Sequence, residues 1–291
     1  MSTATDVLMP DSLTSALETL SADEEAMCLS GGATLVAMLN ANLLEPSALI
    51  SLKDIPGLSG LIKAADGMIE IGAMTRHAQT ASSELLIGGL GGVREAASKI
   101  ANPVVRNMGT MGGSIAFADP GADYPPALIA AAAEIEVCSR TGAKRIAASD
   151  FFVDWYETAL EPGEIVRAIH LPAANPEAAG VHEKFTRVEG DFATVSVNAV
   201  LALDGDTCEM IRIAVGACGP TPVRSADAEA LLVGKPISDE LLTRSGEMLA
   251  AACDPIDDVR GSAAYRLDLV PQLVARAVHR ACRQLNGEVK K

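Results

Sequence analysis

At 291 residues, with 49% hydrophobic side chains, the chain is long enough for one to three domains that each bury a core. A net charge of −15, no Lys/Arg block and 3% aromatic residues argue against nucleic-acid binding, because phosphates would be repelled and bases would find few stacking partners. No apolar run reaches the ~18–20 residues of a membrane-spanning helix, and the N-terminus lacks the basic-then-apolar order of a secretory signal, so we expect a cytoplasmic protein.

The N-terminal part of the chain predicts helices that alternate with short strands. Leu13, Ala16 and Leu17 recur at helical spacing, and Asp11 or Ser12 can cap that helix. Further on, two alternating apolar segments flank Asp66-Gly67, which is typical of a hairpin. The predicted elements are a helix at 11–20, a strand at 26–29, a glycine turn leading into a helix at 34–43, a strand at 47–55 and the hairpin at 60–75.

Residues 102–126, NPVVRNMGTMGGSIAFADPGADYPP, are the most informative stretch. The clustering of Gly109, Gly112 and Gly113 predicts neither an ordinary helix nor a strand. It indicates a backbone that bends through φ > 0 or packs closely against something, for which a ligand is the natural candidate. The elements around it are a helix at 93–100 that ends at Asn102-Pro103, a helix at 128–132 after Pro125-Pro126, a strand at 135–139, a short helix from about 151, a turn at Pro162-Gly163 and a strand ending at Pro172.

Beyond residue 172 the pattern changes. The small-residue segment 173–180 reads as a linker and a domain boundary. Three alternating segments follow and are antiparallel if Asp204-Gly205 is a hairpin turn. The predicted elements are strands at 181–188, 194–203 and 208–217 and helices at about 225–233, 238–252 and 263–285.

Two segments carry the chemistry of anion binding. The first, Leu29–Leu35, places a glycine pair between a strand and a helix N-terminus, where free backbone amides can surround a phosphate. It lacks the lysine of a Walker A loop and the spacing of G-x-G-x-x-G, and an ordinary tight turn is the competing interpretation. The second, Thr110–Ser114, offers amides and hydroxyls, with Asp119 and Asp123 as acceptors for ribose or ribityl hydroxyls. The competing interpretation is a buried loop in which Asp123 caps the helix at Tyr124.

Two such loops about 80 residues apart suit a ligand with two phosphates held from both sides. The six cysteines stand singly, with no zinc or iron–sulfur spacing, and read as reduced thiols. No nucleophile–base constellation stands out, so we predict neither a catalytic residue nor a metal ligand. We interpret His77 as a packed loop residue and Arg76 as either a phosphate partner or a solvated charge.

Five segments in this order and spacing resemble the FAD-binding medium subunit of bacterial molybdenum hydroxylases, the carbon monoxide dehydrogenase and xanthine dehydrogenase superfamily. They are SGGATL, IGAMTRHAQ, the run at 102–128, LEPGEIVRAIHLP and HEKFTRVEGDFATVSVNAV. The resemblance implies an α+β fold. An FAD-binding domain of the PCMH (vanillyl-alcohol-oxidase-like) type with subdomains at 1–55 and 56–175 is followed by a C-terminal domain at 176–291, a three-stranded antiparallel sheet with a helical bundle.

The resemblance also implies a set of FAD-binding residues. Loops 29–36 and 109–114 would hold the pyrophosphate through backbone amides, assisted by hydroxyl groups; Asp123 would hydrogen-bond the FAD, Lys184 would lie near the isoalloxazine ring and Val166 would contact the cofactor through its main chain. Ser114 and Phe192 depart from relatives that carry Asn and Tyr there. The implied set is Leu29, Ser30, Gly31, Gly32, Ala33, Thr34, Leu35, Val36, Gly109, Thr110, Gly112, Gly113, Ser114, Asp123, Val166 and Lys184.

The implied function is electron transfer within a heterotrimeric hydroxylase, assembled as an (αβγ)₂ heterohexamer. A large partner subunit would carry a molybdenum pterin cofactor, a small one two [2Fe–2S] clusters, and this chain FAD, which passes electrons to an external acceptor. One alternative is a self-sufficient flavin oxidase or reductase of the same fold. Another is a scaffold in which the glycine loops are packing turns and the acidic surface docks a partner.

Overall fold

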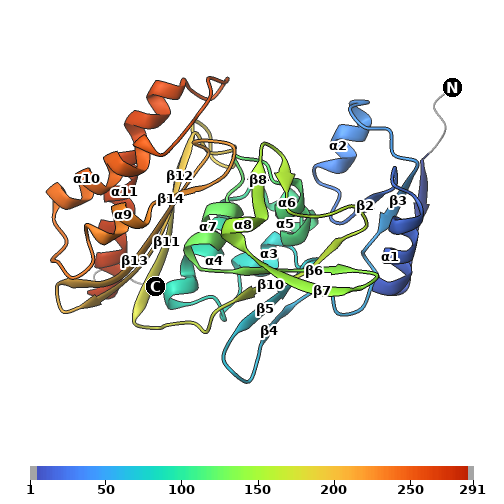
Figure 1. The fold of residues 1–291 in the computed structure, drawn as a ribbon, viewed down its shortest axis with the longest axis horizontal. Coiled ribbons are helices and arrows are strands. Elements are labelled where there is room, and N and C mark those ends of the chain that lie inside the picture. Colours follow the sequence, from blue (N-terminus) through green and yellow to red (C-terminus); the bar gives the residue numbers. More distant parts are fainter. Residues whose placement is uncertain (1–4, 288–291) are drawn as a thin grey trace.

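A computed structural model describes residues 5–287 of the chain. Residues 1–4 and 288–291, the outer ends of the first and third predicted units, lie outside the described part. The molecule is elongated, and three groups of elements follow one another along its long axis in chain order (Figure 1). Each group is built on its own main β-sheet.

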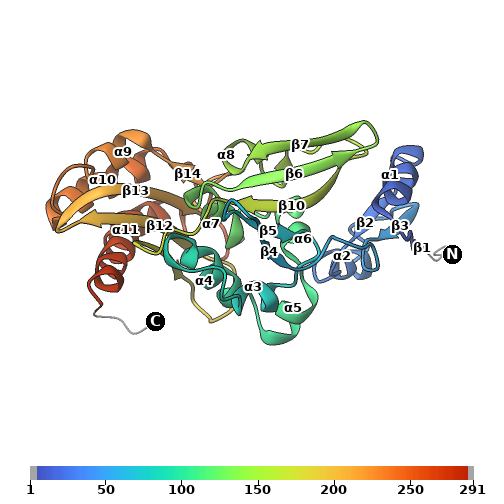
Figure 2. The same ribbon diagram turned by 90° about the horizontal axis from the view of Figure 1, so that it is seen from below.

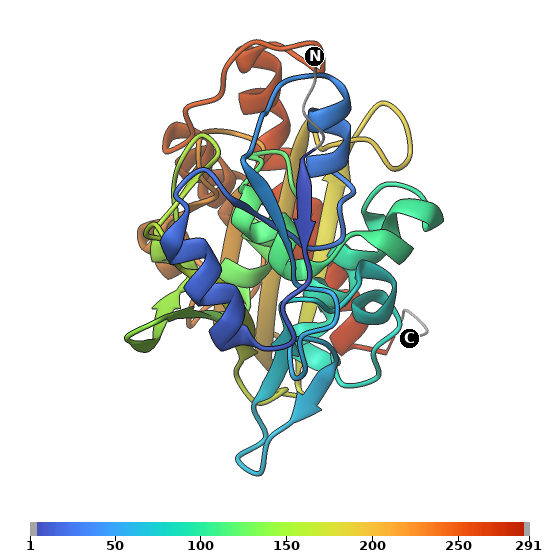
Figure 3. The same cartoon turned by 90° about the vertical axis from the view of Figure 1, so that its right-hand side faces the viewer.

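The N-terminal group is a small parallel sheet of order β1-β3-β2. Ser12 caps its first helix, accepting a hydrogen bond from the amide of Ser15 at 3.2 Å, which satisfies one of the free amides at the helix start. The two helices lie on different sides of the sheet (Figure 3). The elements are β1 (Asp6–Leu8), α1 (Leu13–Ala22), β2 (Met27–Leu29), α2 (Leu35–Asn40) and β3 (Ala48–Ser51).

The middle group is an antiparallel sheet of order β4-β5-β10-β6-β7. Gly67, at φ +88°, makes the predicted turn between β4 and β5. Helices α3 to α6 gather on one side of this sheet (Figure 2). The elements are β4 (Leu61–Lys63), β5 (Ile69–Gly72), α3 (His77–Ala81), the 3₁₀ turn η1 (Gly88–Leu90), α4 (Gly91–Lys99), α5 (Pro103–Met108), α6 (Met111–Phe117), α7 (Tyr124–Ala130), β6 (Glu134–Ser139), β7 (Gly142–Ala147), α8 (Ala148–Phe151), β8 (Phe152–Asp154), β9 (Glu157–Thr158) and β10 (Ile165–Leu171).

Two predictions in the middle group are wrong. The glycine-rich run is not irregular: it forms α5, α6 and the start of α7, and Gly112 and Gly113 are helical residues of α6. None of its glycines has a positive φ. The second half of the prediction, close packing, is confirmed, because a Cβ at Gly112 would lie 2.5 Å from the Cβ of Ala73. The short helix predicted from about 151 instead ends at Phe151, and the hairpin β8–β9 follows.

The C-terminal group confirms the predicted antiparallel strands and helices. Its sheet has the order β11-β12-β13-β14, so a two-residue strand adds a fourth member to the three that were predicted. Helix α11 covers one face, and α4 and α7 of the middle group pack against the other. The elements are β11 (Ala178–Phe185), β12 (Val195–Asp204), β13 (Thr207–Gly216), β14 (Val223–Arg224), α9 (Ala226–Ala230), α10 (Asp239–Ala251) and α11 (Ala263–Leu285).

Side chains on the two faces of β11 contact different parts of the molecule. Successive side chains of a strand point to opposite faces. Val181 and Glu183 therefore lie on the α11 face, where Glu183 pairs with Arg276 and Arg280. His182 and Lys184 lie on the opposite face and contact Asp123, directly before α7. The predicted division at residues 55 and 175 stays a prediction. No helix within residues 5–287 is long and apolar enough to cross a membrane.

Candidate FAD-binding site

The two glycine loops meet in the structure. The hydroxyl of Ser30 lies 2.6 Å from that of Thr110, 80 positions away in the sequence. Gly31 makes the contact possible, since a Cβ at this position would lie 2.1 Å from the carbonyl oxygen of Met108 and 2.8 Å from Cα of Gly109. Both of these atoms are backbone and cannot turn aside. Glycine is thus required at position 31 by close approach of two chain segments.

A cavity of about 900 Å³ opens at this contact, within the size range of small-molecule and cofactor sites. Its walls come from all three groups of elements. Every residue of the predicted binding set lines it except Leu29 and Val36, whose side chains lie next to Gly32. The lining members are Ser30, Gly31, Gly32, Ala33, Thr34, Leu35, Gly109, Thr110, Gly112, Gly113, Ser114, Asp123, Val166 and Lys184.

The first loop presents free backbone amides to this cavity. Between β2 and α2, the amides of residues 30–35 donate no hydrogen bond to any group within residues 5–287. Gly32 turns the chain at φ +74°, a conformation that glycine adopts without a steric penalty. Unpaired amides at a helix start favour a negatively charged ligand. This loop has the donors that a pyrophosphate needs.

The second loop uses most of its amides internally, which differs from the prediction. The amides of Met111 and Gly112 donate to the carbonyls of Thr75 and Ala73, and that of Gly113 to the Thr110 hydroxyl at 3.2 Å. Ser114 and Gly109 are likewise bonded within their helices' first and last turns, so in the described chain only the Thr110 amide of this loop lacks a partner. The loop therefore offers hydroxyl groups and a close backbone surface rather than a row of amides.

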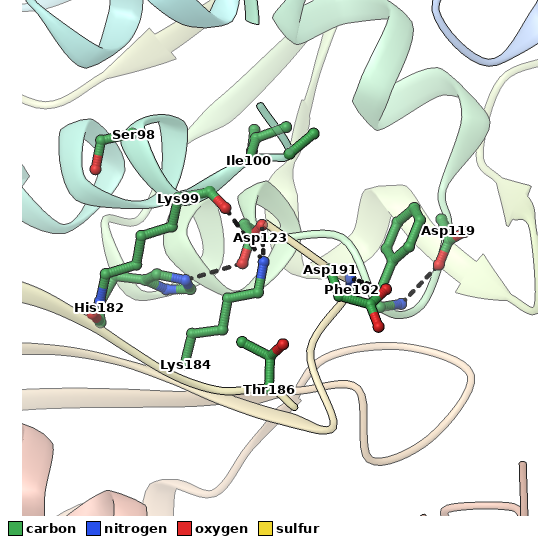
Figure 4. Close-up of polar contacts among 12 residues, drawn as sticks. Ser98, Lys99, Ile100, Asp119, Asp123, His182, Lys184, Thr186, Asp191 and Phe192 are labelled. Atoms are coloured by element: carbon green, nitrogen blue, oxygen red, sulfur yellow. Dashed lines mark hydrogen bonds and ion pairs between the residues drawn. The ribbon is translucent and has the colours of Figure 1, made fainter. Parts of the chain in front are cut away.

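A buried charge cluster forms another part of the wall (Figure 4). Asp123 Oδ2 accepts a hydrogen bond from Lys184 Nζ at 2.9 Å, and its Oδ1 lies 3.0 Å from His182 Nε2. The predicted capping role of Asp123 is wrong: it stands at the N-cap position of α7, but its side chain makes no cap hydrogen bond. The carboxylate is turned to β11 instead.

Electrostatics keep this carboxylate ionised. Burial alone would raise the pKa of Asp123, but the hydrogen bond and charge of His182 and the positive charge of Lys184 lower it below the usual value. Burial, together with Arg280, lowers the pKa of Lys99, which donates to the carbonyl of His182 at 2.6 Å. Asn198 contacts the other ring nitrogen of His182 at 3.0 Å. Asp123 thus holds both His182 and Lys184, and of these two Lys184 lines the cavity with it.

Of the other residues singled out in the sequence, some line the cavity and one does not. Phe192 and Asp119 line the cavity, and the guanidinium of Arg260 stacks 5.2 Å from the ring centre of Phe192. Arg76 is exposed and lies outside the lining, as expected of a solvated charge. His77, interpreted as a packed residue, is buried and also lines the cavity.

Sequence reasoning missed the support behind the site. Neither His182 nor Asn198 belongs to a motif. Only the spacing of two positions between His182 and Lys184 on a predicted strand could have placed these two side chains on one face. All six cysteines are free thiols. Within residues 5–287 no group of three or more His, Cys, Asp or Glu side chains could hold a metal ion.

A cavity of this size, with free amides at one loop and a buried carboxylate–ammonium pair, fits α+β proteins that bind a phosphate-bearing cofactor. Comparison with known families narrows the class. Residues 3–174 match the FAD binding domain in molybdopterin dehydrogenase, and residues 181–281 match the CO dehydrogenase flavoprotein C-terminal domain. The chain belongs to the FAD-binding medium subunits of the molybdenum hydroxylase family.

Individual relatives are similar in sequence to this chain over most of its length. The carbon monoxide dehydrogenase medium chain of Hydrogenophaga pseudoflava is 35% identical over 88% of this chain and 89% of its own length. The nicotine 6-hydroxylase medium subunit of Paenarthrobacter nicotinovorans is 35% identical over 92% of this chain and 94% of its own. The solved carbon monoxide dehydrogenase of H. pseudoflava superimposes with a TM-score of 0.93 at 34% identity, covering 97% of this chain and 98% of that one.

Proposed function

We propose that this chain is the electron-transfer subunit of a heterotrimeric molybdenum-containing hydroxylase. A large molybdenum subunit passes electrons to a small [2Fe–2S] subunit. The FAD of this chain receives them from the small subunit and passes them to an external acceptor. The observation that carries the proposal is the meeting of both glycine loops in one cavity of about 900 Å³. FAD supplies the redox chemistry, and the protein binds, orients and tunes it.

The donors in the cavity divide the work of holding FAD. The amides of residues 30–35 bind the pyrophosphate, because they are the row of donors without partners in the described chain. The hydroxyls of Thr34, Thr110 and Ser114 add contacts from both loops. The glycines of the second loop let it pack closely against its protein neighbours, which are His77 at Gly109, Ala73 at Gly112 and Ser30 at Gly113. Leu29 and Val36 belong to the first loop and lie next to Gly32.

The remaining wall residues act away from the two loops. Lys184 and Asp123 face the isoalloxazine end as a fixed pair, and Val166, the second residue of β10, contacts the cofactor through its backbone. The presence of partner subunits is supported by relatives whose names describe them as dehydrogenase subunits, and the (αβγ)₂ assembly is part of this proposal.

Purification of the native protein tests the function. Expressed with its genomic neighbours, the chain should copurify with two further chains, carry one FAD and give a yellow complex whose flavin is reduced when the complex turns over its substrate. A colourless chain that does not bind added FAD would refute the proposal. A lone yellow chain that oxidises a substrate without partners would favour the self-sufficient oxidase instead.

A further inference from the structure

His77 is held at the edge of the second glycine loop by the backbone. Its amide donates to the carbonyl of Gly109 at 3.0 Å, and the amides of Met111 and Gly112 donate back to Thr75 and Ala73 at 2.9 and 2.8 Å. These bonds fasten the segment before α3 to the start of α6. The imidazole therefore has a fixed position beside Gly109, in the wall of the cavity.

The ring has one nitrogen engaged and one free. Nδ1 lies 3.1 Å from the hydroxyl of Tyr124, which is the single hydrogen bond of this side chain among residues 5–287. The side chain is 5% exposed. A Cβ at Gly109 would lie 2.5 Å from Nε2, although Gly109 has an ordinary φ of −63°. Glycine at 109 thus leaves room for the Nε2 edge of His77.

The proton on this ring depends on Tyr124 and on burial. Burial raises the pKa of Tyr124, so its hydroxyl stays protonated and is able to donate. In the tautomer in which this hydroxyl donates to Nδ1, the ring carries its hydrogen on Nε2, and our proposal uses this tautomer. Burial lowers the pKa of His77 to about 4, against the opposing charge of Asp123 and with a smaller contribution from Arg106, so the ring is neutral near pH 7. Nε2–H is then a donor without a partner among residues 5–287, beside Gly109 of the second loop, in which every amide except that of Thr110 is already bonded.

We propose that His77 is a further cofactor-binding residue, whose Nε2–H donates a hydrogen bond to a phosphate oxygen of the dinucleotide. This rests on the proposed binding of FAD between the two loops. The first loop binds the pyrophosphate with amides, and His77 with the Thr110 amide supplies donors from the opposite side. Tyr124 acts through His77 as a positioning residue that selects its tautomer.

Binding by the deflavinated full-length chain tests the inference, with FAD, ADP and riboflavin as probes. His77→Phe keeps an aromatic ring but removes the donor, and should weaken FAD and ADP by about 10- to 100-fold, the effect of one hydrogen bond to a charged acceptor. Riboflavin, which has no phosphate, should bind as it does to the wild type. His77→Gln, whose amide reaches the Nε2 position, should recover most of the affinity, and Tyr124→Phe should lose a few-fold.

Equal affinity of wild type and His77→Phe for FAD and ADP would overturn the inference. So would an equal loss for all three probes, because that pattern reports ring packing and not a phosphate contact. If His77→Phe does not fold, His77→Ala carries the same comparison. Failure of the wild-type chain to bind FAD at all would instead refute the proposed function, so the two failures are distinguishable.

Discussion

Gly31→Ala tests whether contact between the two loops builds the site. The added methyl group would stand 2.1 Å from the carbonyl oxygen of Met108 and 2.8 Å from Cα of Gly109, so the segments must separate by roughly 1 Å to regain van der Waals contact. Overpacking of this kind costs ~1–3 kcal/mol of stability. The shift also breaks at least one amide–phosphate hydrogen bond, which weakens FAD binding by about 10- to 100-fold.

Gly57→Ala is the matched control. Gly57 has φ +79° with nothing within 4 Å of its missing Cβ, and it lies outside the cavity lining. Backbone strain should cost this variant ~1–2 kcal/mol but leave FAD binding unchanged. Urea unfolding gives the stabilities and flavin fluorescence titration gives the affinities. Wild-type FAD affinity in Gly31→Ala, or an equal affinity loss in both variants, would refute the reasoning.

Two further predictions concern the buried titratable groups. Asp123→Asn leaves Lys184, whose side chain is 4% exposed, without its counter-charge and should destabilise the chain by about 3–5 kcal/mol in urea unfolding; a loss below ~1 kcal/mol would contradict a buried ion pair. His77 has a folded-state pKa of about 4 against ~6.5 in an unfolded chain. The unfolded state therefore binds more protons between these values, and stability falls as the pH drops from 6.5 toward 4, by up to about 3 kcal/mol. His77→Gln should lack this component, and identical pH profiles of the two proteins would contradict it.

The spacing of apolar residues predicted the elements correctly where the burial of side chains follows a simple pattern. The helices α10 and α11 each bury one face, so the apolar spacing identifies them. The strands β11 and β12 are buried on both faces over most of their length, and the apolar run of β12 identifies it. The two-residue strand β14 is too short to show a period. Helix α6 was missed because glycine is a poor helix former; Gly112 is there to pass close to Ala73 and not to adopt an unusual φ.

The site was predictable in outline and less so in its hydrogen bonds. The glycine loops indicated anion binding, which stays a prediction; what the structure adds is their contact at Ser30 and Thr110. Which amides remain free depends on partners 36 and 39 positions away, since the carbonyls of Thr75 and Ala73 accept from the amides of Met111 and Gly112 in the second loop. The turn of Asp123 away from its helix depends on His182 and Lys184, which reach it only through the packing of β11 against α7.

A crystal structure of the chain with FAD tests the central claim most directly. The account predicts that the pyrophosphate lies between the two loops, within hydrogen-bonding distance of the amides of residues 30–35. Pyrophosphate density away from both loops, with these amides facing solvent, would contradict it.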